Sequence, residues 1–257
     1  MSIVIAILAK TKEIFLPIYL NCIYNQTYER KNIHLYIRTN DNTDDTANIL
    51  KQFIDKHGQE YGSVYYNEDN ISENLKKYGE HEWNSDRFKI LGKIRQESIE
   101  YAKQLNADYF VVDCDNFITS NTLETMYKLR ELGVVAPMLT TDSAYSNYHY
   151  DVDDNGYYKS HDEYFKILGR HKLGVYPVKV VHCTYFINNN VLNDVCYDDE
   201  SYRYEYVIFS HLLRKKRIEQ YLDNRTHYGV ISFNSKKEEL IDYLKKLGCQ
   251  EWLDLTL

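Results

Sequence analysis

The chain has 257 residues, a formal net charge of −7 and a hydrophobic content of 44%. This length supports one substantial hydrophobic core, and no stretch has the composition of a linker, so we predict a single domain over residues 1–257. The negative net charge argues against a nucleic-acid-binding protein, because such a protein needs a positive face to meet the phosphates.

An apolar run at residues 3–9 comes first among the predicted elements. It lacks the basic leader of a signal peptide and is too short to span a membrane, so we interpret it as a buried strand. The five cysteines are odd in number and scattered without zinc-finger spacing, which is typical of reduced thiols. We therefore expect a cytoplasmic protein without a membrane span.

Strands and helices alternate through the first half of the chain. Apolar runs predict the strands, and apolar residues at helical spacing predict the helices. Strands are predicted at residues 3–9, 33–38, 64–66 and 108–112, and helices at residues 13–24, 47–57 and 87–104. This order implies a parallel sheet with right-handed crossovers, so the polar loops after the second and fourth strands lie at the same edge.

The second half of the chain is less regularly patterned. It contains predicted helices at residues 121–132, 205–217 and 236–247, and predicted strands at residues 134–139, 156–158, 178–187 and 218–222. The fold class is therefore α/β, with a mainly parallel sheet flanked by helices and a smaller antiparallel part in the second half.

Two carboxylates, Asp113 and Asp115, follow the apolar strand at residues 108–112. Side chains alternate along an extended backbone, so both carboxylates point the same way while Cys114 turns inward. Mn²⁺ and Mg²⁺ prefer oxygen ligands and share their coordination with substrate phosphates and water. Short acidic triplets also occur at ordinary strand ends. A metal site is favoured here because ligands of open α/β sheets bind beyond the carboxyl ends of strands.

A series of short blocks follows the order of a known family. The blocks are Thr39-Asn40-Asp41-Asn42-Thr43-Asp44-Asp45-Thr46, Trp83-Asn84-Ser85-Asp86-Arg87-Phe88, Lys93-Ile94-Arg95-Gln96, Ala107-Asp108-Tyr109, Asp113-Cys114-Asp115-Asn116, Val134-Val135-Ala136-Pro137-Met138-Leu139, Ala144-Tyr145-Ser146-Asn147, Gly156-Tyr157-Tyr158-Lys159, Val181-His182-Cys183-Thr184 and Tyr228-Gly229. With them the chain resembles the N-terminal glycosyltransferase domain of the procollagen galactosyltransferases, which are family 25 glycosyltransferases. The resemblance implies a GT-A fold, UDP-galactose as donor, Mn²⁺ or Mg²⁺ as cation, and inverting transfer to hydroxylysine of a collagen-like protein.

The resemblance also implies roles for individual residues. Asp113 and Asp115 are implied to bind the metal, and His227 is our candidate for the third ligand. The implied donor-binding residues are Thr39, Asn40, Asp41, Asp44, Asp86, Arg95, Asp113, Cys114, Asp115 and Asn147. A solvent-exposed role competes for Arg95, and a loop-capping role competes for Asp86.

Loop residues beyond the later strands are implied to line the sugar or acceptor side. Tyr145 and Asn147 belong to such a loop, and irregular loops beyond strand ends carry specificity. His182 follows a buried strand, where a histidine is more often packed than functional, although it lies in one of the blocks that match the family.

Inversion needs a base on the acceptor side, and Glu205 is the candidate. The family has a pair of aspartates where this chain has Tyr204 and Glu205, so one carboxylate remains. Glu205 could instead be an acid that the helix dipole favours in a first turn. Asp198, Asp199 and Glu200 are competing candidates for the base.

Two further functions remain open at this point. The same fold could transfer a UDP-hexose to a lipid-linked or polysaccharide-linked glycan, as related bacterial members of the family do. A catalytically inactive module that serves adhesion or scaffolding is the other alternative. Retention of Asp113 and Asp115 argues against it, since a binding module would not need them.

Overall fold

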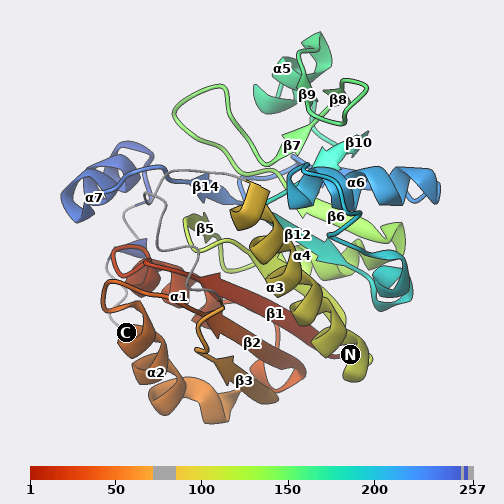
Figure 1. The fold of residues 1–257 in the computed structure, drawn as a ribbon. Helices are drawn as coiled ribbons and strands as arrows, with labels where there is room; N and C mark the ends of the chain where they lie inside the picture. Colours follow the sequence, from red (N-terminus) through yellow and green to blue (C-terminus); the bar gives the residue numbers. More distant parts are fainter. Residues whose placement is uncertain (72–84, 250–251, 254–257) are drawn as a thin grey trace.

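The computed structural model describes residues 1–71, 85–249, 252 and 253. It contains a central sheet with helices on both faces, as Figure 1 shows, which confirms the predicted α/β class. Trp83 and Asn84, which belong to one of the sequence blocks, lie outside the described residues.

The central sheet has eight strands, in the order β10-β13-β6-β12-β4-β1-β2-β3. The bounds are β1 (Ile3–Ala9), β2 (Ile33–Thr39), β3 (Ser63–Asn67), β4 (Asp108–Val112), β6 (Val134–Pro137), β10 (Val175–Val178), β12 (Thr184–Ile187) and β13 (Gln220–Asp223). Strands β4, β1, β2 and β3 are parallel to one another, as predicted. The loops after β2 and β4 therefore reach the same edge of the sheet.

The predicted strand at residues 178–187 divides in the structure, and its last part becomes β12. The structure inserts β12 into the centre of the main sheet, antiparallel to both β4 and β6. Smaller two-stranded sheets pair β5 (Asn116–Ile118) with β14 (Gly229–Ile231), β7 (Tyr148–His149) with β11 (Val180–Val181), and β8 (Asp151–Val152) with β9 (Tyr158–Lys159).

The alternation of side chains along β1 divides the core into two layers. Ile3, Ile5 and Ile7 belong to one buried cluster, and Val4 and Ala6 belong to the other. The first cluster is packed by α1 (Leu16–Tyr24), α2 (Thr46–His57), α4 (Thr122–Lys128) and α7 (Lys237–Lys246), and the second by α3 (Ser85–Gln104), α5 (Asp162–Leu168) and α6 (Glu205–Lys215). Helices α3 and α6 thus approach the sheet from the same face.

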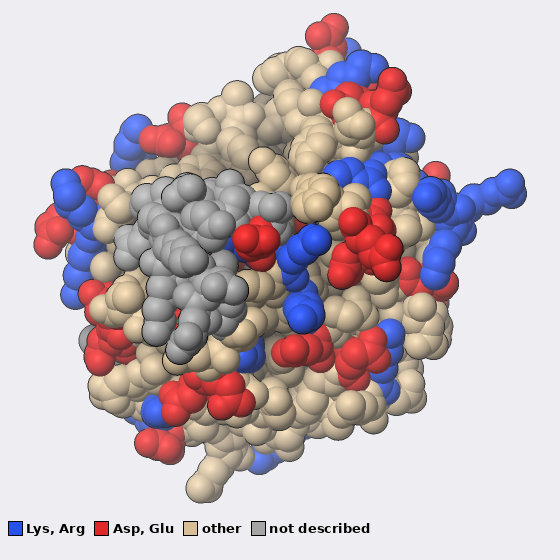
Figure 2. Space-filling view, viewed as in Figure 1, with Lys and Arg blue, Asp and Glu red and all other residues tan. Residues whose placement is uncertain are grey.

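The pairing of β5 with β14 requires a glycine at residue 229. A Cβ atom on Gly229 would lie 2.1 Å from the carbonyl oxygen of Phe117, and its φ of 152° disfavours other residues. This close approach ties β14 to the segment that follows the two aspartates. Within the described residues, no helix combines the length and apolar character of a membrane span. Acidic and basic side chains are interspersed over the face shown in Figure 2.

Candidate active site

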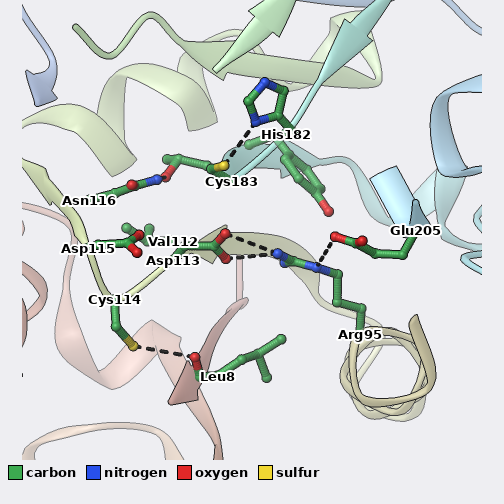
Figure 3. A network of polar contacts seen from close by, with 12 residues as sticks. Leu8, Arg95, Val112, Asp113, Cys114, Asp115, Asn116, His182, Cys183 and Glu205 are labelled. Carbon is green, nitrogen blue, oxygen red and sulfur yellow. Dashed lines mark hydrogen bonds and ion pairs between the residues drawn. The ribbon is translucent and has the colours of Figure 1, made fainter. Parts of the chain in front are cut away.

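The two aspartates stand at the carboxyl end of β4, in the middle of the sheet. The amide of Asp113 donates to the carbonyl of Cys183 at 2.9 Å, and the amide of Ser232 donates to the carbonyl of Asp115 at 2.9 Å. Cys114 points away from both carboxylates (Figure 3), and its Sγ lies 3.4 Å from a backbone carbonyl of β1. This confirms that Cys114 turns inward. Its thiol packs toward β1, and binding of the nucleotide-sugar donor by Cys114 stays a prediction.

Arg95 of α3 lies between Asp113 and Glu205, which reach it from opposite sides (Figure 3). Nη2 of Arg95 donates to the two carboxylate oxygens of Asp113 at 2.9 and 3.1 Å. Its Nε forms an ion pair with Oε1 of Glu205 at 3.4 Å. The side chains of Arg95 and Glu205 are each 4% exposed, so the solvent-exposed alternative for Arg95 is wrong.

Burial sets the electrostatics of this group. It raises the pKa of Glu205, and the Arg95 charge opposes the shift. Burial likewise raises the pKa of Asp113, again opposed by Arg95 and reinforced by the Asp115 charge. Among the described residues, Nη1 of Arg95 and Oε2 of Glu205 are buried without a hydrogen-bond partner. Buried polar groups of this kind normally have partners, so each atom has unused hydrogen-bonding capacity.

Lys12 is a site residue that the sequence interpretation missed. Its Nζ donates to Oδ2 of Asp115 at 2.9 Å, and the two side chains are 29% and 27% exposed. Lys12 follows β1, whose carboxyl end lies beside that of β4, so its place in the strand order was the available signal. Asp113 and Asp115 therefore each have a basic partner, from α3 and from the loop after β1.

The segment after β2 holds residues 11–13, the loop that carries Lys12. The backbone amides of these three residues donate to side chains of that segment: Thr11 to Asn42 Oδ1 at 2.8 Å, Lys12 to Thr46 Oγ1 at 2.6 Å and Glu13 to Asp44 Oδ2 at 3.0 Å. Thr39 accepts a hydrogen bond from Asn42, and Asn40 donates to Asp41. Asp44 thus has a structural role, and donor binding by Thr39, Asn40 and Asp41 stays a prediction.

Asn147 is a structural residue, in contrast to its predicted contact with the donor. Its Oδ1 accepts from the amide of Leu139 at 2.8 Å, and its Nδ2 donates to the carbonyls of Pro137 and Thr184 at 2.9 and 3.1 Å. The side chain is fully buried, so no donor hydrogen of its amide is left for a ligand. Asp86 lies exposed in the first turn of α3, where the helix dipole favours an acid.

Glu205 is better placed for catalysis than its acidic competitors. Asp199 forms an ion pair with Arg203, and Asp198 accepts a hydrogen bond from the amide of Glu200. These contacts stabilise the local turn before α6. Glu205 opens α6 without a side-chain capping bond and is buried beside Arg95, so it belongs to the group around Asp113.

His227 does not join the two aspartates. The pairing of β14 with β5 places Ile231 opposite Asn116, whereas Gly229 lies opposite Ile118. His227 precedes Gly229, so it lies exposed at the end of β14 that is remote from Asp115. In the described part of the chain, no three His, Cys, Asp or Glu side chains form a metal-binding group. The structure therefore does not bring His227, the candidate for the third metal ligand, to the two aspartates.

Aromatic rings lie beside the carboxylates. His182 packs against Tyr145, with ring centroids 5.8 Å apart, and against Tyr206 at 5.1 Å. Its Nδ1 lies 2.9 Å from Sγ of Cys183, and burial lowers its pKa well below the ordinary value. These contacts favour the packed role of His182. Tyr145 also contacts the exposed ring of Phe233, so the loop of Tyr145 borders the site.

Comparison with known sequences yields one family over almost the whole chain. The model for the N-terminal domain of glycosyltransferase family 25 matches residues 1–247. A glycosyltransferase 25 family member of Drosophila melanogaster is 33% identical over 195 residues, which cover 74% of this chain and 31% of that protein. The inactive glycosyltransferase 25 family member 3 of Mus musculus is 32% identical, covering 73% and 32%. Procollagen galactosyltransferase 2 of Mus musculus is 26% identical, covering 93% and 40%.

This chain thus spans a third to two fifths of the length of these curated relatives. Solved structures show the same fold at low identity. TarS 1–349 of S. aureus in complex with UDP-GlcNAc has a TM-score of 0.58 at 12% identity, covering 95% of this chain and 64% of that chain. The mannosyltransferase PcManGT of Pyrobaculum calidifontis, in complex with GDP-Man and Mn²⁺, has a TM-score of 0.55 at 10% identity, covering 95% and 63%. The predicted GT-A fold is confirmed.

Proposed function

The chain belongs to glycosyltransferase family 25, and from this membership we propose that it transfers galactose from UDP-galactose, with inversion, to hydroxylysine of a collagen-like acceptor. The observation that carries the proposal is the group at the end of β4, where Asp113 and Asp115 stand beside the buried pair of Arg95 and Glu205. The name of the relative procollagen galactosyltransferase 2 supports the choice of donor and acceptor.

The donor set fits a hard divalent cation, Mn²⁺ or Mg²⁺. Asp113 and Asp115 offer carboxylate oxygens at the carboxyl end of β4. Such cations bind one or two carboxylates together with substrate phosphates. Bound there, the cation would neutralise charge that develops on the departing diphosphate. Arg95 holds Asp113 in place by two hydrogen bonds to its carboxylate.

Glu205 is the proposed base. A base has to be ionised, and the contact of Oε1 with Arg95 favours the charged form against the effect of burial. The other oxygen, Oε2, is buried without a partner among the described residues and can accept the proton of an acceptor hydroxyl. Arg95 thereby orients one oxygen of Glu205 and leaves the second for the substrate.

Release of UDP, measured with UDP-galactose, Mn²⁺ and a hydroxylysine-containing collagen peptide, tests this proposal. We expect turnover by the unaltered protein and strong loss in the Asp115→Ala and Glu205→Gln variants. Glu124→Gln is the matched control, because Glu124 is an acid in the first turn of α4 that pairs with Lys128 on the surface. Turnover with glycan acceptors and none with peptides would contradict the proposed acceptor.

An inactive module is the second candidate, because a relative that is 32% identical is named inactive. Isothermal titration of UDP with and without Mn²⁺ separates the two. Binding of UDP that strengthens with Mn²⁺ supports the enzyme. Absence of UDP binding, or binding that ignores Mn²⁺, supports the module.

A further inference from the structure

Lys12 occupies one carboxylate oxygen of Asp115, a proposed metal ligand. Its Nζ lies 2.9 Å from Oδ2 of Asp115, and the two side chains are 29% and 27% exposed. The ammonium group also lies 4.9 Å from the centroid of the Phe15 ring. One compact positive charge therefore neutralises Asp115, one of the two proposed metal ligands.

Hydrogen bonds hold the backbone of Lys12, and the tip of its side chain is held by Asp115. Its amide donates to Thr46 at 2.6 Å, and the amides on either side are held by Asn42 and Asp44. Thr11, directly before it, has a φ of 50°, a conformation that is uncommon outside glycine and that these bonds maintain. A lysine side chain is a flexible four-carbon stem with three rotatable donors. Nζ can therefore leave Asp115 yet remain within the site.

We propose, on the basis of the function proposed above, that Lys12 is a displaceable counter-ion that links cation binding to nucleotide binding. Without ligand, Lys12 neutralises Asp115 and so competes with a divalent cation for the same oxygen. When a nucleoside diphosphate is present, Nζ moves from Asp115 to a phosphate oxygen, which is the negative group that arrives with the cation. Cation and nucleotide then bind more tightly together than either does alone.

Isothermal titration of Mn²⁺ into protein with and without UDP tests the role of Lys12. We expect Lys12→Met to bind Mn²⁺ alone roughly tenfold more tightly than the unaltered protein, because the competing charge is gone. We also expect UDP to increase the Mn²⁺ affinity of this variant roughly tenfold less than it does in the unaltered protein. Lys12→Arg keeps the positive charge, so its Mn²⁺ affinities with and without UDP should stay close to those of the unaltered protein.

Two controls isolate the contact with Asp115. Lys128→Met removes a lysine that pairs with Glu124 at 2.8 Å on the surface, and it should change neither affinity. In an Asp115→Asn background, Lys12→Met should no longer tighten Mn²⁺ binding. An Mn²⁺ affinity that is unchanged or weakened in Lys12→Met overturns the role of Lys12 alone. Failure of the unaltered protein to bind Mn²⁺ and UDP overturns the proposed function as well.

Discussion

Replacement of Arg95 by methionine should cost about 4 kcal/mol of folding free energy at pH 7.5. The guanidinium is the partner of two carboxylates, and both Arg95 and Glu205 have side chains only 4% exposed. Removal of one partner of a buried ion pair costs about 3–5 kcal/mol, because the other charge stays buried without compensation. Asp113 is 27% exposed and gains some hydration, so the loss should not reach the sum of two such pairs. The free energy of unfolding of a typical domain is about 5–15 kcal/mol, so the variant should fold but have marginal stability.

The pH dependence of this loss follows from the direction of the pKa shifts. Burial raises the folded-state pKa of Asp113 and Glu205, so each contributes stability that is complete below its unfolded pKa and lost as the pH rises through its folded pKa. Arg95 opposes both shifts. Without Arg95 both pKa values should rise further, so the deficit of the variant should be greatest near neutral pH and shrink toward about pH 4, where the unfolded carboxyls titrate.

Urea-induced unfolding, followed by circular dichroism at pH 7.5 and pH 5.0, measures this deficit. Lys216→Met is the control, because Lys216 and Asp194 form an exposed pair and its loss should cost at most about 1 kcal/mol. A deficit of Arg95→Met below about 1 kcal/mol would show that Arg95 is not the compensating charge. A deficit that grows toward acid would show that the assigned direction of the pKa shifts is incorrect.

Three further predictions have defined outcomes. Asp115→Ala should lower kcat for UDP release about 100-fold to 1000-fold, with a thermal midpoint close to that of the unaltered protein because the residue is partly exposed. Glu205→Gln should lower kcat/KM about 100-fold or more, and the rise of kcat/KM with pH, which the raised pKa of Glu205 places above the usual carboxyl range, should disappear from its pH profile. Gly229→Ala should cost more than about 3 kcal/mol in urea unfolding, because its Cβ would meet the Phe117 carbonyl, whereas Gly248→Ala has open space and should cost about 1 kcal/mol. An equal loss for the two glycine variants would contradict the steric argument.

The first half of the fold could be predicted because local pattern and tertiary structure agree there. The run that became β1 is apolar at every position, since both faces of the strand are covered, and the predicted bounds match the observed Ile3–Ala9. β12 was harder. Its four residues, Thr184–Ile187, are all buried, but their antiparallel place between β4 and β6 depends on the return of a distant segment. A periodicity reports burial and not which strand is the neighbour.

Individual site residues differ in the same way. Asp113 and Asp115 could be found because they directly follow an apolar strand. Their extended alternation was not observed, because β4 ends at Val112 and the amide of Asn116 closes a turn onto the carbonyl of Asp113. The separation of His227 from Asp115 could not be foreseen, because it depends on the register between β14 and β5, which the local sequence does not encode. The amide of Asn147 looked available because its partners, Pro137 and Thr184, come from two other parts of the chain.

The charge balance of the site connects these observations to the order of binding. Three carboxylates, those of Asp113, Asp115 and Glu205, are paired with two cations, Arg95 and Lys12. This group of five side chains therefore has one excess negative charge when all are ionised. A nucleoside diphosphate that binds without a cation is repelled by this negative charge. Its one new ionic partner in the group is Lys12, which must first leave Asp115. A divalent cation reverses the sign of the group, so nucleotide affinity should depend on the cation, and Lys12 should govern the size of that dependence.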